Sequence, residues 1–146
     1  MKMTKWLIST AALLALPLVL FGGGFWLQLG NPQASPEATA LKAVLIVQPV
    51  GCHEPEKAKV TATAVGMVKG KRQTIPLKLI ALSTPATYAL TQQWPAEGKW
   101  AIQLVAVKDD AITSAIATAG PNGVDRTKAK FFKGEPEAQQ LEAALR

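Results

Sequence analysis

The residues best suited to chemistry in this chain are the adjacent Cys52 and His53. A thiolate and an imidazole are good ligands for Cu(I) or Zn(II), and Glu54 or Met67 could assist them. A closed structural zinc site takes four protein ligands, so this pair supplies half of one. Metal binding through Cys52 and His53 is therefore the second of two functional hypotheses that follow from the sequence.

Catalytic use of the same pair is disfavoured by its spacing. Adjacent side chains in an extended chain point to opposite sides, which separates a nucleophile from its base. The chain has one histidine and one cysteine, and it has neither a glycine-rich phosphate loop nor a nucleophile elbow. Asp109 and Asp110 are adjacent carboxylates, but such a pair is typical of a hairpin turn. We predict that the protein is not an enzyme and takes no cofactor.

The first thirty residues have the character of an export segment. No charged side chain occurs over the 24 positions 6–29, and two lysines precede this run. As a helix, the run from Trp6 to Trp26 would span about 30 Å, the thickness of the hydrocarbon core. Tryptophans at both ends match the aromatic belts of membrane helices. We predict a retained anchor over residues 1–30, with its N-terminus cytoplasmic and the remaining chain periplasmic or extracellular.

Two alternatives to an anchor remain open. Small residues at 22–24 or at 38–40 could form a signal-peptidase site, and the protein would then be secreted after cleavage. Residues 50–52 resemble the end of a lipid-attachment box, but Cys52 lies more than twenty residues beyond the apolar run. Since a single cysteine cannot form an internal disulfide, Cys52 is expected to be a reduced loop residue or an intermolecular crosslink.

Beyond a linker at residues 31–41, short strand-like runs recur with turn signals between them. The clearest hairpin joins residues 59–68 to 74–82 through Gly70, and Pro76 predicts that its strand lies at a sheet edge. About six such runs at this spacing predict a mainly β chain with an antiparallel β-sandwich over residues 42–120. The predicted strands are 41–47, 59–68, 74–82, 87–94, 99–107 and 112–119.

The segment 121–146 is predicted to be a tail that ends in a short helix. Pro136 suits a first helical turn, and Leu141 and Leu145 fall on one stripe. This stripe could pack on the sandwich, or it could face a partner. We take Leu141 and Leu145 as the candidate partner-facing residues.

At Tyr88, Trp94, Gly98 and Trp100 the chain resembles the small immunoglobulin-like sandwiches of exported bacterial proteins, including copper-resistance-type domains. The shared pattern is a strand with an inward tyrosine, a turn with glycine, and a strand that begins with an aromatic residue. The resemblance covers about residues 42–120. It implies an immunoglobulin-like fold and a binding role, with no activity attached.

The pattern of basic residues argues against nucleic acid as a partner. Its formal net charge is +6, and two small basic clusters occur at residues 69–72 and 128–133. Aromatic residues do not alternate with these bases as a nucleic-acid stacking platform requires, so we predict no nucleic-acid partner. The first hypothesis is a non-enzymatic, membrane-tethered extracytoplasmic interaction module, an accessory subunit of a larger membrane complex. The sequence does not predict a small-molecule ligand.

Overall fold

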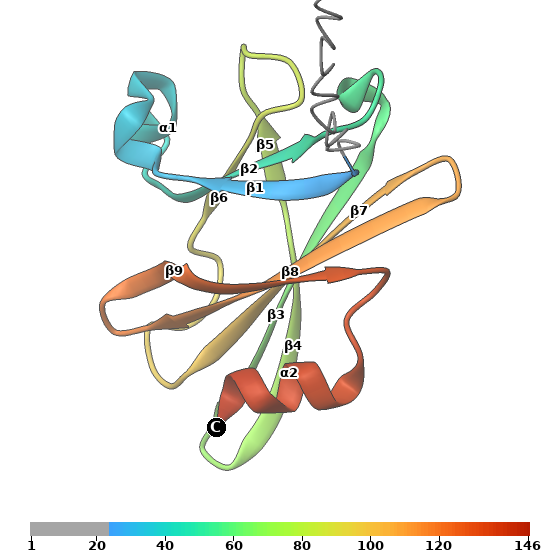
Figure 1. The fold of residues 1–146 in the computed structure, drawn as a ribbon. Helices are drawn as coiled ribbons and strands as arrows, with labels where there is room; N and C mark the ends of the chain where they lie inside the picture. The colour runs from blue at the N-terminus through green and yellow to red at the C-terminus, as the bar shows by residue number, and fades with distance from the viewer. Residues whose placement is uncertain (1–23) are drawn as a thin grey trace, which may run out of the picture.

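Two antiparallel β-sheets packed face to face make up the fold of the computed structural model, which describes residues 24–146 (Figure 1). The four-stranded sheet has the order β1-β2-β6-β5 and the five-stranded sheet the order β4-β3-β7-β8-β9. The strands of the first sheet are β1 (Trp26–Gly30), β2 (Ala43–Val50), β6 (Tyr88–Thr91) and β5 (Leu79–Ala81). Those of the second are β4 (Lys71–Leu77), β3 (Lys59–Val68), β7 (Trp100–Lys108), β8 (Ala111–Gly120) and β9 (Gly123–Lys133).

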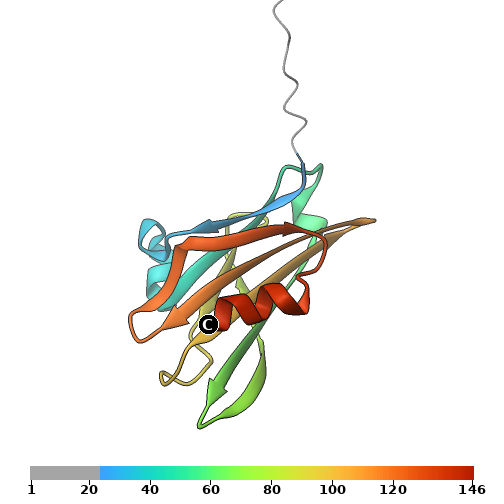
Figure 2. The same ribbon diagram turned by 60° about the horizontal axis from the view of Figure 1, so that its bottom comes forward.

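Two helices and two short 3-10 turns complete the structure. Helix α1 (Pro36–Ala40) follows the turn η1 (Pro32–Ala34), and the turn η2 (Pro55–Lys57) lies between β2 and β3. Helix α2 (Ala138–Leu145) packs against β7 and β8 of the five-stranded sheet (Figure 2). The predictions of a mainly β, antiparallel fold and of a short C-terminal helix are confirmed. In residues 24–146, no helix is both long enough and apolar enough to cross a membrane.

The core between the sheets follows from the alternation of side chains along each strand. Leu45, Val47 and Leu90 project from the four-stranded sheet, while Ile102 and Leu104 project from the five-stranded one. All five are fully buried. Alternate residues of a strand face the same side, so the period-two patterns of 87–94 and 99–107 predicted Leu90, Ile102 and Leu104. Residues 41–47 form a continuous apolar run, which predicted a strand but not which of its side chains face the core.

A close contact between Trp100 and Gly66 joins β7 to β3 in the core. Trp100 is paired with Gly66 across β7 and β3, and a Cβ atom on Gly66 would lie 2.5 Å from the indole ring. The indole Nε1 donates a hydrogen bond of 2.8 Å to the carbonyl oxygen of Glu97. Glycine therefore gives the large ring a place directly on the neighbouring backbone.

The predicted strand 74–82 is divided between the two sheets. Its first part is β4, an edge strand as Pro76 predicted, and its last part is β5 in the other sheet. At the crossover, the Gln93 carboxamide pairs with the Lys78 backbone: Nε2 donates to the carbonyl oxygen at 2.9 Å, and Oε1 accepts from the amide at 2.8 Å. The Gln93 side chain thus satisfies the backbone groups of Lys78, which lies between β4 and β5.

The sandwich extends beyond the predicted limits of 42 and 120 at both ends. Residues 123–133 of the predicted tail form β9, and the predicted linker contains η1 and α1. Trp26, taken as the outer end of a membrane helix, is the first residue of β1, and the adjacent Leu27 is buried in the core. The alternation of Leu27 and Leu29 with Gln28 lay hidden inside a longer apolar run. The predicted anchor residue Trp6 lies outside the described residues.

Candidate functional site

The Cys52 and His53 pair lies in the loop between β2 and β3, beside the beginning of β1. Cys52 is half-buried and His53 is exposed. The preceding Gly51 has a φ of +80°, and a Cβ atom there would clash with the Gly24 carbonyl oxygen and lie 2.6 Å from the Trp26 ring. Close packing of this loop on β1 therefore requires glycine at position 51.

The predicted helper ligands do not complete a metal site around this pair. The Glu54 carboxylate forms an ion pair with Lys57, at 2.9 Å. Met67 lies near the opposite end of β3 from Lys59, about 26 Å along a strand that rises about 3.3 Å per residue. Within residues 24–146, no three His, Cys, Asp or Glu side chains gather as metal ligands. Metal binding by Cys52 and His53 remains a prediction.

Exposed aromatic side chains mark the end of the sandwich where β1 begins and β9 finishes. The side chains of Trp26 and Phe131 are 46% and 51% exposed, and Lys133 lies beside them. With Phe25 and Thr113 they line a shallow hollow of about 230 Å³ between β1 and the ends of β8 and β9. We call this the Trp26 surface.

Helix α2 lies against the five-stranded sheet, has a cap at its start, and is joined to neighbouring elements by contacts in its second half. At the start, the Glu137 amide donates to Gln140 Oε1 at 2.7 Å in a capping box. Further along, Glu142 forms an ion pair with Arg72 of β4, and Lys99 Nζ donates to the Arg146 backbone oxygen. The contacts of Glu142 with Arg72 and of Arg146 with Lys99 connect α2 to its own sheet.

The predicted partner-facing residues therefore belong to a helix that already has one packed side. Leu141 and Leu145 are both half-buried, and no α2 residue is fully buried. That they also face a partner remains a prediction. Of the two alternatives, packing on the sandwich is seen in the contacts of α2 with β7 and β8.

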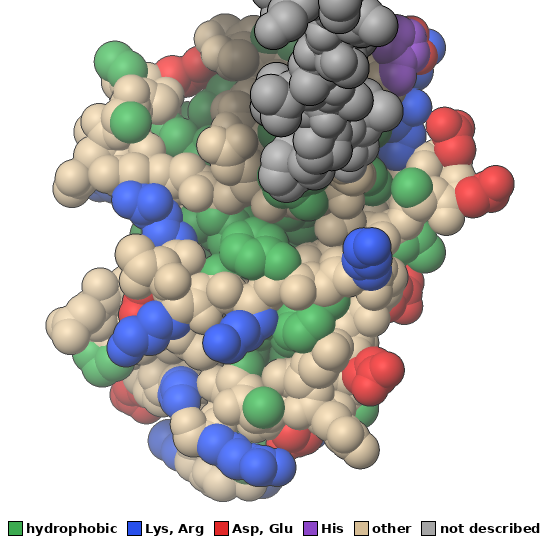
Figure 3. All heavy atoms as spheres, in the orientation of Figure 1, with side chains coloured by type: hydrophobic (Ala, Val, Ile, Leu, Met, Phe, Trp, Pro, Cys, Tyr) green, Lys and Arg blue, Asp and Glu red, His purple; other side chains and the backbone are tan. Residues whose placement is uncertain are grey.

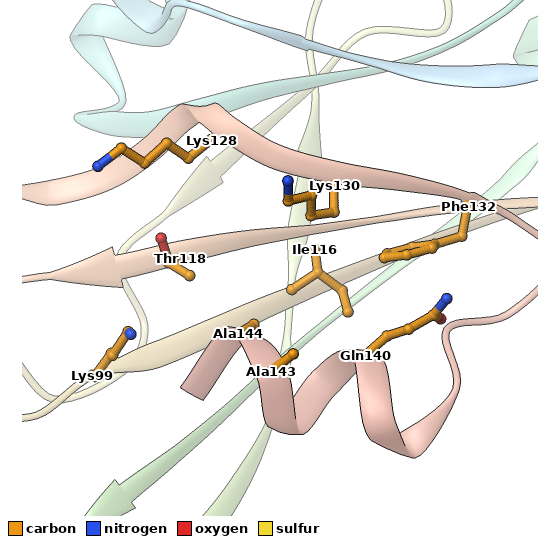
Figure 4. Close-up of a pocket in the computed structure, with 9 residues that line it drawn as sticks. All are labelled: Lys99, Ile116, Thr118, Lys128, Lys130, Phe132, Gln140, Ala143 and Ala144. Carbon is orange, nitrogen blue, oxygen red and sulfur yellow. The ribbon is translucent and has the colours of Figure 1, made fainter. Parts of the chain in front are cut away.

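A second hollow lies between α2 and the sheet (Figure 4). It has a volume of about 230 Å³, and β9 forms one side of it and α2 the other. We call it the α2 pocket. It is lined by Lys99, Ile116, Thr118, Lys128, Lys130, Phe132, Gln140, Ala143 and Ala144.

The lining of the α2 pocket carries positive charge only. Three lysines belong to it, and no aspartate or glutamate does. Lys128 Nζ lies 3.7 Å from the Asp125 carboxylate outside the lining. A hydrogen bond of 2.6 Å from Thr127 Oγ1 is the main cause that lowers the pKa of Asp125, and the Lys128 charge adds to it. Figure 3 shows blue basic side chains beside green hydrophobic surface on this face.

The sequence did not predict this pocket, because the second basic cluster was expected to lie in a solvated tail. In β9 the side chains of Lys128, Lys130 and Phe132 share one face, the face turned toward α2. Their spacing of two residues was the available signal. The first cluster plays a different part, since Arg72 pairs with α2 while Lys69 and Lys71 are exposed at the β3–β4 turn.

No protein-family model, curated protein or solved structure matches this chain.

Proposed function

We propose that this protein is a non-enzymatic interaction module, tethered to the extracytoplasmic face of a membrane, that serves as an accessory subunit of a larger membrane complex. The observation that carries the proposal is the Trp26 surface. Its two aromatic side chains, Trp26 and Phe131, are about half exposed at the end of the sandwich where the N-terminal segment joins. Contiguous exposed apolar surface of this kind marks interaction sites in proteins.

The distance between the tether and the sandwich supports the same proposal. Only Gly24 and Phe25 separate residues 1–23 from β1, and two residues reach at most about 7 Å. The uncharged run 6–23 retains 18 residues, which is within the range of about 17–25 for a membrane helix. A tether there would hold the Trp26 surface at the membrane, where Trp and Tyr are enriched in membrane proteins.

The strand order supports an immunoglobulin-like assignment for the sandwich. The order β1-β2-β6-β5 corresponds to strands A, B, E and D of that fold, and β3-β7-β8 corresponds to C, F and G. Strand β4 then takes the place of C′, and β9 is an addition after G. Folds of this class serve many unrelated functions, so the functional proposal depends on the Trp26 surface rather than on the fold.

The partner that fits this surface is a membrane protein with an apolar patch near the bilayer. Aromatic residues are enriched in the cores of protein interfaces, and Trp and Tyr often dominate the binding energy. Lys133 at the margin would sit in the polar rim that surrounds such cores. The module would then contribute contacts and positioning to the complex rather than chemistry.

Site-specific photocrosslinking in native membranes tests the proposal. A photoreactive phenylalanine analogue would replace Phe131, and in a matched control it would replace Met67, which is 46% exposed at the opposite end of the sandwich. We expect one discrete adduct of higher mass from position 131 and none from position 67. Equal adducts from both positions, or no adduct from position 131, would overturn the proposal.

A further inference from the structure

The floor of the α2 pocket is apolar and consists of the buried Ile116 side chain and the half-buried Phe132 ring. Ile116 of β8 and the Phe132 ring of β9 line it from the sheet, as Figure 4 shows. Ala143 and Ala144 line it from the helix. Besides these alanines, α2 contributes one long side chain to the lining, that of Gln140, so the helical side of the pocket is mainly small and apolar. The hollow is therefore suited to apolar groups of a ligand.

Cationic side chains stand around this floor. Lys128 and Lys130 extend from β9, and Lys99 extends from the position just before β7 (Figure 4). Lys128 and Lys99 have partners outside the lining, in Asp125 and the Arg146 backbone oxygen. Among the ion pairs of residues 24–146, none includes Lys130. The Lys130 ammonium is thus available to an anion at the margin of the pocket.

We infer that the α2 pocket binds a small amphipathic monocarboxylate, with its hydrocarbon part on Ile116 and Phe132 and its carboxylate at Lys130. The positive lining complements one negative charge and opposes a cation of the same length. The volume of about 230 Å³ equals that of about eight liquid water molecules at ~30 Å³ each. A carboxylate of about six carbons, with eight non-hydrogen atoms, fits that space.

Methyl NMR on the full chain in zwitterionic nanodiscs tests this inference, with isoleucine methyl labels and hexanoate as the probe. We expect a saturable shift of the Ile116 signal and no shift of Ile102, which is fully buried in the core between the sheets. Affinity should rise about fourfold per methylene from butanoate to hexanoate, and should level off at octanoate when the pocket is full. Hexylammonium should leave Ile116 unshifted over the same concentrations.

Two variants test the contributions of charge and of pocket volume to binding separately. Lys130→Gln should weaken hexanoate binding by about fivefold or more, because it removes a charge-assisted hydrogen bond. Lys71→Gln, at an exposed lysine of β4 outside the lining, is the matched control and should leave the affinity unchanged. Ala144→Leu keeps all three lysines and fills the hollow, so it should abolish the Ile116 shift. An unchanged Ile102 signal verifies the fold of each variant.

The inference would be overturned by the absence of a saturable Ile116 shift with hexanoate, by an equal shift with hexylammonium, or by equal affinities of the Lys130→Gln and Lys71→Gln variants. Continued tightening beyond octanoate would also overturn it, because it would indicate a long acyl chain on an open surface. The inference is independent of the proposed function. Crosslinking from position 131 can fail while hexanoate still binds, and the reverse holds as well.

Discussion

Gly66 is the residue at which the smallest change should have a large effect. A methyl group there would meet the Trp100 ring at 2.5 Å, and the ring is held by its hydrogen bond to Glu97. We expect Gly66→Ala to lower the free energy of unfolding by about 1–3 kcal/mol, the usual cost of overpacking. Denaturant unfolding measures the change. Gly120→Ala is the control, because a Cβ at Gly120 meets no atom within 4 Å; equal losses would contradict the steric account.

Cys52 is the residue that decides the metal hypothesis. If Cys52 and His53 bind Cu(I), titration of the reduced protein should show binding that Cys52→Ser abolishes, because the thiolate is the softer ligand of the two. With two candidate side chains in the loop, a bound ion would need further ligands from a second molecule. Light scattering during the titration should then report association. Binding that survives Cys52→Ser would exclude this site.

Gln93 is expected to stabilise the crossover between β4 and β5, which the sequence predicted as one strand. Its carboxamide makes two hydrogen bonds with the Lys78 backbone, where the chain passes from β4 to β5. We expect Gln93→Ala to lower the free energy of unfolding by about 1 kcal/mol, since Lys78 is exposed and water can replace part of the lost hydrogen bonding. Amide exchange should accelerate in β5.

A second glutamine provides the comparison for that experiment. Gln73 is exposed on the edge strand β4, so Gln73→Ala should change stability by less than about 0.5 kcal/mol. If the two variants were equally stable and β5 exchanged at the same rate in both, the crossover would not depend on Gln93.

The sequence predicted strands well where alternation and turn signals agreed. The turn at Gly70, the turn at Asp109 and Asp110, and the edge position of Pro76 are all confirmed. Strand β1 was missed because Leu27 and Leu29 continue an apolar run that resembles a membrane segment. Strand β9 was missed because its exposed lysines suggested a solvated tail. The pairing of β1 with β2 spans η1 and α1 and leaves no local signal. Strand β9 forms a hairpin with β8 through residues 121–122, so its two-residue spacing was a local signal that was overlooked.

The α2 pocket was unpredictable for a related reason. Its lining combines Lys99, which lies just before β7, with residues of β8, β9 and α2, so its members are spread along the chain from residue 99 to residue 144. The loop that contains Cys52 and His53, by contrast, could be located from its flanking prolines and glycine alone. Local chemistry was predictable, whereas a site assembled by packing was not.

The sandwich as a whole restricts where its N-terminus can begin. Cleavage at residues 38–40 would remove β1, with its buried Leu27, and would cut α1 at the fully buried Ala38. Loss of the Leu27 side chain alone would cost about 2 kcal/mol of apolar burial. We therefore expect the N-terminus of the native protein to lie before Phe25. Intact mass spectrometry measures it directly, and a mass that corresponds to a chain beginning at residue 41 would refute the expectation.

The direct connection of the N-terminal segment to β1 also has a mechanical consequence. A pull on Phe25 along the axis of β1 would load all five register pairs with β2 at once, from Trp26 opposite Val50 to Gly30 opposite Ile46. Strands loaded in shear in this way resist force better than strands peeled apart pair by pair. If a membrane partner moved relative to this domain, the tension would reach the four-stranded sheet through β1. The hydrogen bonds between β1 and β2 would then bear the load together.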